Sequence, residues 1–162
     1  AWGGFAQWAT RLGVTASRFA PEAARPAPDR SHPAMAVNLD ACIACGLCAR
    51  ACRDVQANDV IGMGWRGEHH APVFDLADPM AASTCVACGE CVQACPTGAL
   101  MPKSIVDARA QAGSRRADRS VTSVCPFCGV GCLVSFEVRD GRIAYVEGVD
   151  GPANEGRLCV KG

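Results

Sequence analysis

Twelve cysteines are the residues through which this 162-residue sequence could perform chemistry. Eight of them form a repeat, because each member of a first group recurs 43 residues later in a second group. The repeated positions are Cys42, Cys45, Cys48 and Cys52, followed by Cys85, Cys88, Cys91 and Cys95. The remaining positions are Cys125, Cys128, Cys132 and Cys159. The cysteines therefore divide into three sets.

The spacing within the repeat is typical of iron-sulfur chemistry. A Cys-x2-Cys-x2-Cys run places three thiolates on one tight loop, where they can bind three corners of a cubic cluster. In the two-cluster bacterial ferredoxin pattern, the fourth cysteine of each run binds the other cluster. This rule assigns one 4Fe-4S cluster to Cys42, Cys45, Cys48 and Cys95, and a second to Cys52, Cys85, Cys88 and Cys91. Such crossed ligation would join the two halves of the repeat.

The residues between these cysteines fit the same chemistry. Small residues would let backbone N–H groups approach the sulfur atoms, and apolar residues would shield the sites from water. The small residues are Ala44, Gly46, Ala87 and Gly89, and the apolar ones are Ile43, Leu47, Val86 and Val92. The first run also carries Arg50 and Arg53, where the second has Gln93 and Pro96. We expect these arginines to raise the reduction potential of the cluster that Cys52 serves.

Zinc sites and disulfides are two other uses of cysteine. Zinc sites usually bring cysteines in two separated pairs, whereas here three lie on one loop. Disulfides are allowed by the even count, but secreted disulfide frameworks seldom repeat a ferredoxin spacing. For the third set, the spacing alone leaves both zinc and a cluster open.

The composition indicates a chain that needs such cross-links. With 17 Gly, 10 Pro and few aromatic side chains, it has little material for a large hydrophobic core. The formal net charge is zero, which argues against nucleic acid or anionic lipid as a partner. No run approaches the ~20 apolar residues of a membrane span. Because the sequence starts without Met and stops just after a cysteine, we expect a piece of a longer polypeptide with its own upstream and downstream domains.

The remaining patterns predict the elements that position the cysteines. Phe5, Trp8 and Leu12 predict a helix over residues 1–12 that ends at Gly13. Two connectors are predicted, one proline-rich over residues 21–33 and one over residues 103–120, whose Arg115, Arg116 and Arg119 should form a solvated face.

Short strands and one hairpin complete the expected elements. Strands are predicted at 37–39, 60–61 and 73–74, and a helix at 49–54. Alternation after Cys132 predicts a hairpin with a two-residue turn at Asp140 and Gly141. Pairing across that turn should set Val138 opposite Ile143, and Phe136 opposite Tyr145.

Two segments carry a family resemblance. Residues 36–104 resemble two-cluster ferredoxin domains. Residues 125–132 (CPFCGVGC), together with residues 154–162 (NEGRLCVKG), resemble the opening of the molybdopterin oxidoreductase superfamily. With DVQ at 54–56, NDVIG at 58–62 and STCVACGEC at 83–91, the order of motifs is similar to the catalytic subunit of NAD-dependent molybdenum or tungsten formate dehydrogenases.

The resemblance implies roles that spacing alone does not supply. Cys125, Cys128, Cys132 and Cys159 would bind the 4Fe-4S cluster nearest the pterin, and Lys161 would lie between that cluster and the pterin as an electron relay. A bis-molybdopterin guanine dinucleotide with Mo or W, and all catalytic residues, would belong to a downstream domain. FMN and NAD would bind to partner subunits, which also carry further iron-sulfur centres. His32, His69 and His70 match no ligand position and are expected to be solvent-facing or locally hydrogen-bonded.

These observations predict an α+β chain. Its expected parts are an N-terminal helix and connector (1–35), a ferredoxin-like domain with two clusters (36–104), a linker (105–120) and a small β-rich 4Fe-4S domain (121–162). The expected function is to relay electrons from formate oxidation towards a flavin and NAD-reducing partner in the cytoplasm. The alternatives are an iron-sulfur subunit of an NADH dehydrogenase or hydrogenase-like complex, and a non-catalytic zinc-binding interaction module.

Overall fold

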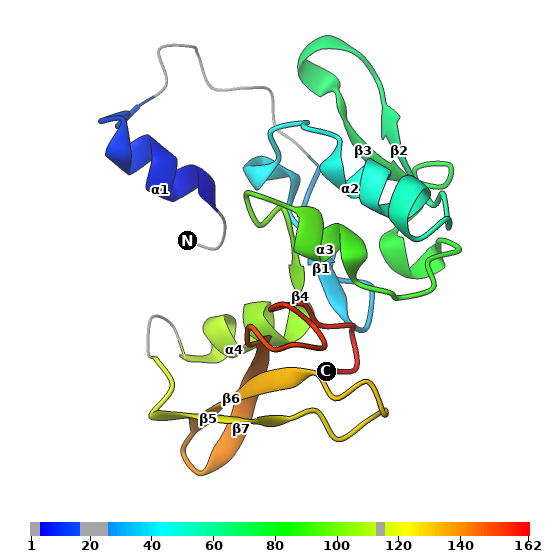
Figure 1. Ribbon diagram of the computed structural model, residues 1–162. Coiled ribbons are helices and arrows are strands. Elements are labelled where there is room, and N and C mark those ends of the chain that lie inside the picture. The colour runs from blue at the N-terminus through cyan, green and yellow to red at the C-terminus, as the bar shows by residue number, and fades with distance from the viewer. Residues whose placement is uncertain (1–3, 17–25, 113–115) are drawn as a thin grey trace.

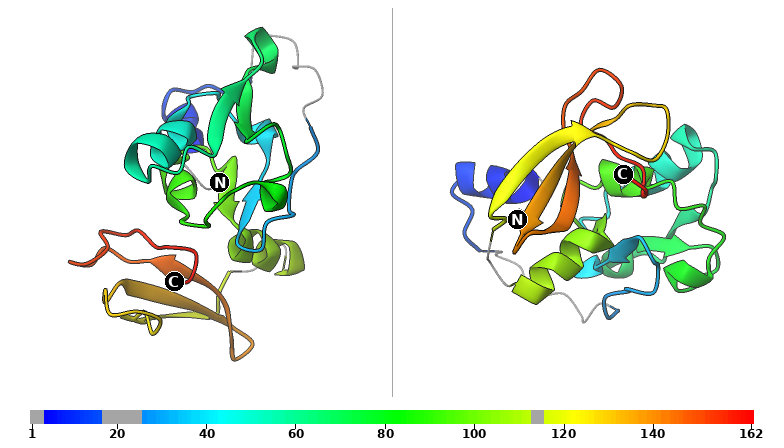
Figure 2. Two further views of the ribbon diagram at one scale, coloured as in Figure 1. Left: turned by 90° about the vertical axis from the view of Figure 1, so that its right-hand side faces the viewer. Right: turned by 90° about the horizontal axis from the view of Figure 1, so that it is seen from below.

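A computed structural model describes residues 4–16, 26–112 and 116–162, and most of them belong to two packed regions (Figure 1). One region surrounds the eight repeated cysteines with short helices and small sheets. The other is a three-stranded antiparallel sheet followed by a C-terminal loop. Figure 2 shows that this loop lies on the side of the sheet that faces the first region.

The cysteine-rich region contains two antiparallel strand pairs. Strand β1 (Met35–Val37) pairs with β4 (Leu100–Pro102), and β2 (Ile61–Gly64) pairs with β3 (Ala71–Phe74). The helices of this region are α2 (Leu47–Arg50), the π-helical turn η2 (Ala51–Val55) that continues it, and α3 (Glu90–Ala94). Its 3-10 turns are η1 (Leu39–Ala41), η3 (Gly67–His69) and η4 (Met80–Ala82). Helix α3 packs against α2 and η2, so that the two cysteine motifs face each other.

The core of this region contains thiols as well as hydrocarbon. Its apolar side chains include Met35, Ile61, Phe74, Met80 and Leu100, all at most 6% exposed. Cys48, Cys52 and Cys91 are buried in the same cluster. The centre of this region is therefore a group of sulfur atoms, which is unusual for a core that has to be stable without a bound group.

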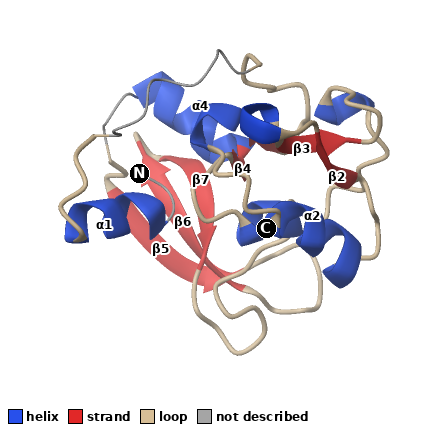
Figure 3. Ribbon diagram, turned by 90° about the horizontal axis from the view of Figure 1, so that it is seen from above, coloured by secondary structure: helices blue, strands red, loops and turns tan. Residues whose placement is uncertain are grey.

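The second region is built on strands β5 (Arg119–Val124), β6 (Leu133–Arg139) and β7 (Arg142–Gly148), in that order across the sheet. Helix α4 (Lys103–Ala112) follows β4 directly and packs against β7 (Figure 3). Ile105 and Ala108 of this helix are buried, and Arg139 Nη1 donates a hydrogen bond of 3.2 Å to the Ala108 carbonyl. The helix thus connects the two regions.

The hairpin prediction is confirmed in its turn and wrong in part of its register. Asp140 and Gly141 both adopt positive φ, at 50° and 73°, as a type I' turn requires. Val138 pairs with Ile143 as expected. A bulge between Glu137 and Val138 then shifts the register, so that Tyr145 pairs with Glu137 and not with Phe136.

Other elements differ from the prediction at their boundaries. The strand expected at 37–39 lies at Met35–Val37, because the Asn38 side chain accepts a hydrogen bond from the Asp40 N–H and begins a 3-10 turn there. The helix expected at 49–54 begins earlier, at Leu47, and continues as the π-helical turn. The strands expected at 60–61 and 73–74 pair with each other, with Ile61 opposite Phe74.

The prediction of a connector over residues 103–120 is wrong. Its first ten residues form α4, and Arg119 and Ser120 begin β5. The helix forms because Ile105 and Ala108, three positions apart, are buried on one side of a segment rich in alanine. Arg116 and Arg119 are exposed as expected, whereas Arg115 lies outside the described residues.

The N-terminal helix is confirmed as α1 (Gly4–Arg11). It ends where expected, since Gly13 adopts a φ of 67° just after the last turn. Of the proline-rich connector, residues 21–25 lie outside the described part, and residues 26–33 form only an isolated bridge from Asp29 to Val37. Within the described part of the chain, no helix has the length and apolar character needed to cross a membrane.

Candidate metal centres

Two cavities in the cysteine-rich region divide the eight repeated cysteines between them. The first cysteine cavity is lined by Cys42, Cys45, Cys48 and Cys95, and the second by Cys52, Cys85, Cys88 and Cys91. Each cavity therefore receives three cysteines from one loop and the fourth from the other motif, which is the crossed arrangement expected from the spacing.

The two loops have the same backbone. Ala44 and Ala87 adopt left-handed φ values of 53° and 58°, and Gly46 and Gly89 adopt 71° and 81°. These turns direct backbone N–H groups towards sulfur: Ala44 N–H donates to Cys42 Sγ at 3.3 Å, and Ala87 N–H to Cys85 Sγ at 3.4 Å. Concave loops of this kind stabilise negative charge. The expected approach of backbone donors to sulfur therefore occurs at both alanines.

The apolar residues of the loops only partly cover the cavities. Val92 is buried at 2% exposure, but Ile43, Leu47 and Val86 are 50%, 39% and 63% exposed. Ile43 lines the first cavity and Val86 the second, as expected for shielding residues, although both stay half exposed or more. Leu47 and Val92 line neither cavity. Met63 and Pro72 from the β2–β3 hairpin line the first cavity, and Val60 and Ile61 line the second. Sequence patterns did not identify this hairpin as part of either site.

Burial and mutual repulsion raise the pKa of several thiols. Burial, with smaller contributions from the neighbouring Cys42 and Cys95, raises the pKa of Cys48 to about 11. Burial, followed by Cys85 and Cys88, also raises the pKa of Cys91. Protein groups alone thus disfavour several thiolates in one place. A bound cation reverses that preference, because metal ligation deprotonates the thiol.

Cys95 differs from the other buried thiols. Burial on its own would raise its pKa, but hydrogen bonds from the backbone N–H groups of Leu100, Thr97 and Gly98 and from the Thr97 hydroxyl hold the pKa below its ordinary value. These donors favour the thiolate, which is the form that binds a metal. The residues after Pro96 therefore favour the metal-binding form of Cys95 in the cavity that it shares with Cys42, Cys45 and Cys48.

The third set lies at the end of the three-stranded sheet. Cys125 and Cys132 continue the β5–β6 ladder, since the Cys125 N–H donates to the Cys132 carbonyl at 2.8 Å. The last turn of the chain contacts the same place: a Cβ built on Gly162 would lie 3.7 Å from Cys125 Sγ and from the Cys159 carbonyl oxygen. Cys128 lies exposed in the intervening loop, and Lys161 is exposed beside Cys159. The geometry thus brings Cys125, Cys132 and Cys159 to one end of the sheet.

Asn154 holds the loop that carries Cys159. This buried side chain accepts from the Leu133 N–H at 2.9 Å and donates to the carbonyls of Leu133, Val149 and Arg157. It therefore ties the C-terminal loop to the first residue of β6, next to Cys132. The NEGRLC motif by itself does not indicate this role, which depends on contacts with residues distant in sequence.

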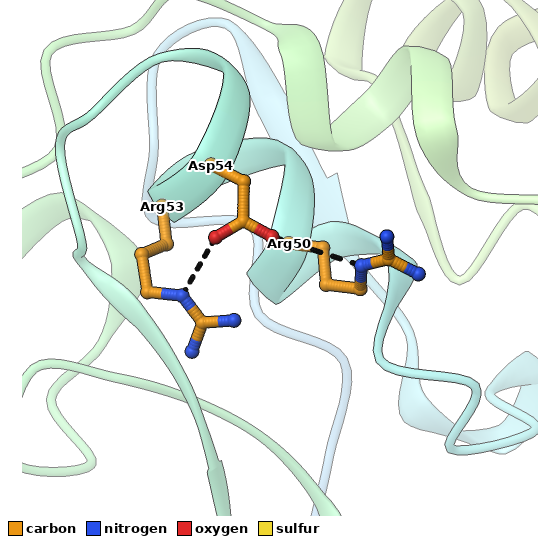
Figure 4. Close-up of polar contacts among 3 residues, drawn as sticks. All are labelled: Arg50, Arg53 and Asp54. Carbon is orange, nitrogen blue, oxygen red and sulfur yellow. Dashed lines mark hydrogen bonds and ion pairs between the residues drawn. The ribbon is translucent and has the colours of Figure 1, made fainter.

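The arginines of the first motif are already paired. Arg53 Nε lies 2.9 Å from Asp54 Oδ1, and Arg50 Nε lies 3.7 Å from Asp54 Oδ2 (Figure 4). All three side chains are about half exposed or more, so solvent and the shared carboxylate reduce the field of the two guanidiniums. The higher potential expected for the Cys52 site stays a prediction, with a smaller effect than two isolated charges would produce.

The histidines take no part in the cysteine sites. His32 is buried and its Nδ1 accepts a hydrogen bond of 3.1 Å from the Ala34 N–H. His69 is exposed, 3.6 Å from Glu68. Among the described residues, no three His, Cys, Asp or Glu side chains lie close enough to hold a single metal ion. A 4Fe-4S cluster needs its cysteines farther apart than a single metal ion does, because each thiolate binds a different iron atom. The thiol donor set and the two cavities fit such a group.

Comparison with known proteins agrees with this division of the chain. Residues 41–99 match the family model described as a 4Fe-4S dicluster domain. Residues 118–162 match the molybdopterin oxidoreductase Fe4S4 domain. The two matches cover the two cysteine cavities and the third cysteine set, respectively.

Individual relatives are also similar. "Putative formate dehydrogenase YrhE" of Bacillus subtilis is 36% identical over an alignment covering 84% of this chain and 17% of that protein. A protein of the same description from Staphylococcus haemolyticus is 31% identical, over 76% of this chain and 16% of its own length. A crystal structure of an NAD+-reducing NiFe hydrogenase superposes with a TM-score of 0.53 and 30% identity, covering 59% of this chain and 41% of that one. The chain thus spans about a sixth of the length of the two formate dehydrogenase relatives.

Proposed function

This chain contains a 4Fe-4S dicluster domain followed by the Fe4S4 domain of molybdopterin oxidoreductases, and on that premise we propose that it is the electron-transfer region of a formate dehydrogenase catalytic subunit. Each of three bound 4Fe-4S clusters would supply reversible one-electron chemistry. The residues of this chain would hold the clusters and set their spacing. Formate itself, and the Mo or W pterin cofactor, would be bound by a downstream domain.

The observation that carries the proposal is the crossed lining of the two cysteine cavities. Cys95 joins the loop of Cys42, Cys45 and Cys48, and Cys52 joins the loop of Cys85, Cys88 and Cys91. A zinc-binding interaction module would not require each motif to contribute one cysteine to the site of the other motif. The two-cluster ferredoxin arrangement does require it.

The third set would bind the cluster nearest the pterin. Cys125, Cys128, Cys132 and Cys159 would be its ligands, and Lys161 would follow as the relay towards the pterin. Support comes from the match of residues 118–162 and from the contacts that gather three of these cysteines. The exposed position of Lys161 leaves its side chain accessible to a following domain.

The electron acceptor is proposed to be a partner subunit with FMN and NAD, with further iron-sulfur subunits in the same cytoplasmic complex. The similarity to an NAD+-reducing hydrogenase supports this choice. The same similarity favours a second candidate, an iron-sulfur subunit of a hydrogenase-like or NADH dehydrogenase complex. The two candidates differ in the electron donor and share the clusters.

Iron analysis of the anaerobically purified full-length protein tests the proposal. We expect about twelve iron atoms and as many acid-labile sulfides per chain, with EPR signals of reduced 4Fe-4S clusters. Formate should then bleach the clusters of the purified complex, and H2 should not. Protein that contains zinc or disulfides in place of iron would contradict the whole proposal. Bleaching by H2 or NADH, and not by formate, would support the second candidate.

A further inference from the structure

The C-terminal loop contacts one of the two ferredoxin-type motifs through polar side chains. Arg157 Nη1 lies 2.7 Å from Glu90 Oε1, and the Glu90 side chain is only 13% exposed. Gln93 Nε2 donates a hydrogen bond of 3.1 Å to the Leu158 carbonyl. Glu90 and Gln93 belong to α3, which carries Cys91, and Leu158 directly precedes Cys159. We call these contacts the junction.

Gly89 lets the two segments approach closely at the junction. It is buried in the left-handed conformation, and a Cβ built on it would lie 3.3 Å from Val160 Cγ1 and 3.7 Å from the Val160 nitrogen. Gly89 also lines the second cysteine cavity, between Cys88 and Cys91. Backbone next to the second cavity therefore touches backbone next to Cys159.

The first motif lacks every one of these features. The repeat places Gly46, Leu47 and Arg50 where the second motif has Gly89, Glu90 and Gln93. A Cβ on Gly46 would meet nothing within 4 Å. Leu47 has no charge and is exposed, and Arg50 pairs with Asp54 of its own helix. The polar side chains that meet the C-terminal loop thus occur only in the second of two otherwise equivalent motifs.

From this asymmetry we propose that Glu90 and Gln93 are positioning residues that hold the Cys159 segment against the Cys85–Cys91 loop. With clusters bound, electron exchange with the third centre would take place at the second cysteine cavity and not at the first. One electron would pass from the centre held by Cys159 to the centre held by Cys88 and Cys91, with no bond broken and no proton moved. The inference rests on the function proposed above.

The test compares two matched glycine variants in the full-length holoprotein. Gly89→Ala and Gly46→Ala introduce the same left-handed strain, but only the first adds a methyl group against Val160. We expect Gly89→Ala to weaken the EPR spin-spin interaction between the reduced second and third centres. Gly46→Ala should leave that interaction unchanged. Equal effects of the two variants would contradict the inference.

Charge variants separate positioning from simple loss of structure. Glu90→Gln should increase hydrogen exchange of the amides of residues 157–161 by about two- to fivefold, as loss of a partly exposed ion pair allows. The double variant Glu90→Arg/Arg157→Glu should restore both protection and spin-spin interaction. Unchanged exchange and spectra in Glu90→Gln protein with full iron content would overturn the inference and leave the proposed function intact. Absence of iron in the unmodified protein would overturn both.

Discussion

The left-handed alanines and glycines of the two cysteine loops show how single residues prepare a site for a metal cluster. A side chain with a Cβ rarely adopts positive φ, yet Ala44 and Ala87 both do so at equivalent positions. The cost is offset because each turn directs its N–H to a cysteine sulfur. The same logic applies to Cys95, where backbone donors lower the pKa of the thiol. Backbone donors thus favour the thiolate at Cys95, whereas at Cys85 burial outweighs the Ala87 N–H and raises the pKa.

Crossed ligation makes a prediction about Cys95. We expect Cys95→Ala to remove about four iron atoms, those of the cluster held by Cys42, Cys45 and Cys48, although Cys95 belongs to the other motif. Iron analysis with EPR redox titration measures this. Cys52→Ala is the matched control and should remove the other cluster. Loss of the Cys85–Cys91 cluster in the Cys95 variant would show that each motif binds its own four ligands.

A pH effect is expected from His32. Burial of the ring and the nearby Lys103 lower its pKa below the ordinary value of 6.5, while Asp29 opposes them. As the pH falls through about 6.5, His32 therefore becomes protonated in the unfolded chain before it does so in the folded chain. The stabilisation from neutral His32 is complete above that pH, and the free energy of unfolding should decrease as the pH falls below it.

The variant His32→Asn tests this effect. Its amide oxygen can replace Nδ1 as acceptor for the Ala34 N–H, but it does not titrate in this range. Urea unfolding of iron-loaded protein between pH 7 and pH 5 should therefore show a weaker pH dependence in the variant than in the unmodified chain. His69→Asn, at an exposed position, is the control. Identical pH profiles for all three proteins would exclude His32 as the source.

At the scale of elements, close backbone approaches determine where the C-terminal loop lies. The β6–β7 hairpin ends at Gly148, and the loop returns so closely that a Cβ on Gly148 would overlap the Gly156 carbonyl. Asn154 hydrogen-bonds the same loop to Leu133 at the start of β6. The position of Cys159 relative to Cys132 thus depends on a glycine and an asparagine that bind no metal themselves.

Gly148→Ala should displace this loop. We expect it to lower the free energy of unfolding by about 1–3 kcal/mol, as overpacking typically does, and to reduce iron at the third site. Thermal unfolding and iron analysis measure the two effects. Gly129→Ala is the control, because its Cβ would meet nothing within 4 Å and its φ is not left-handed. A stable Gly148→Ala protein with full iron content would show that the loop can relax without cost.

At the scale of the whole molecule, the two regions differ in what stabilises them. The cysteine-rich region has a core made partly of Cys48, Cys52 and Cys91 and of short strand pairs. The sheet region has long antiparallel ladders, with Val134 and Val138 buried on its central strand. The stability of the first region should therefore depend on bound clusters far more than that of the second.

Removal of iron tests this difference. Treatment with a chelator and reductant should lower the midpoint of thermal unfolding by roughly 10 °C or more. Hydrogen exchange should rise throughout the helices α2 and α3 while strands β5–β7 stay protected. Equal loss of protection in both regions would mean that the clusters stabilise the chain as one unit.

Some properties of this protein follow from the sequence by itself, because they depend on short-range spacing. The three cysteine sets and the turn at Asp140 and Gly141 follow from the sequence pattern. The crossed ligand assignment stays a prediction, supported by the lining of the two cavities. Helix α4, the bulge after Glu137 and the strand β5 were missed, since each depends on packing against residues distant in sequence. The same holds for the contact between Gly89 and Val160. Spacing predicts which ligands a loop can present, whereas the order in which neighbouring centres meet is decided only when remote segments pack together.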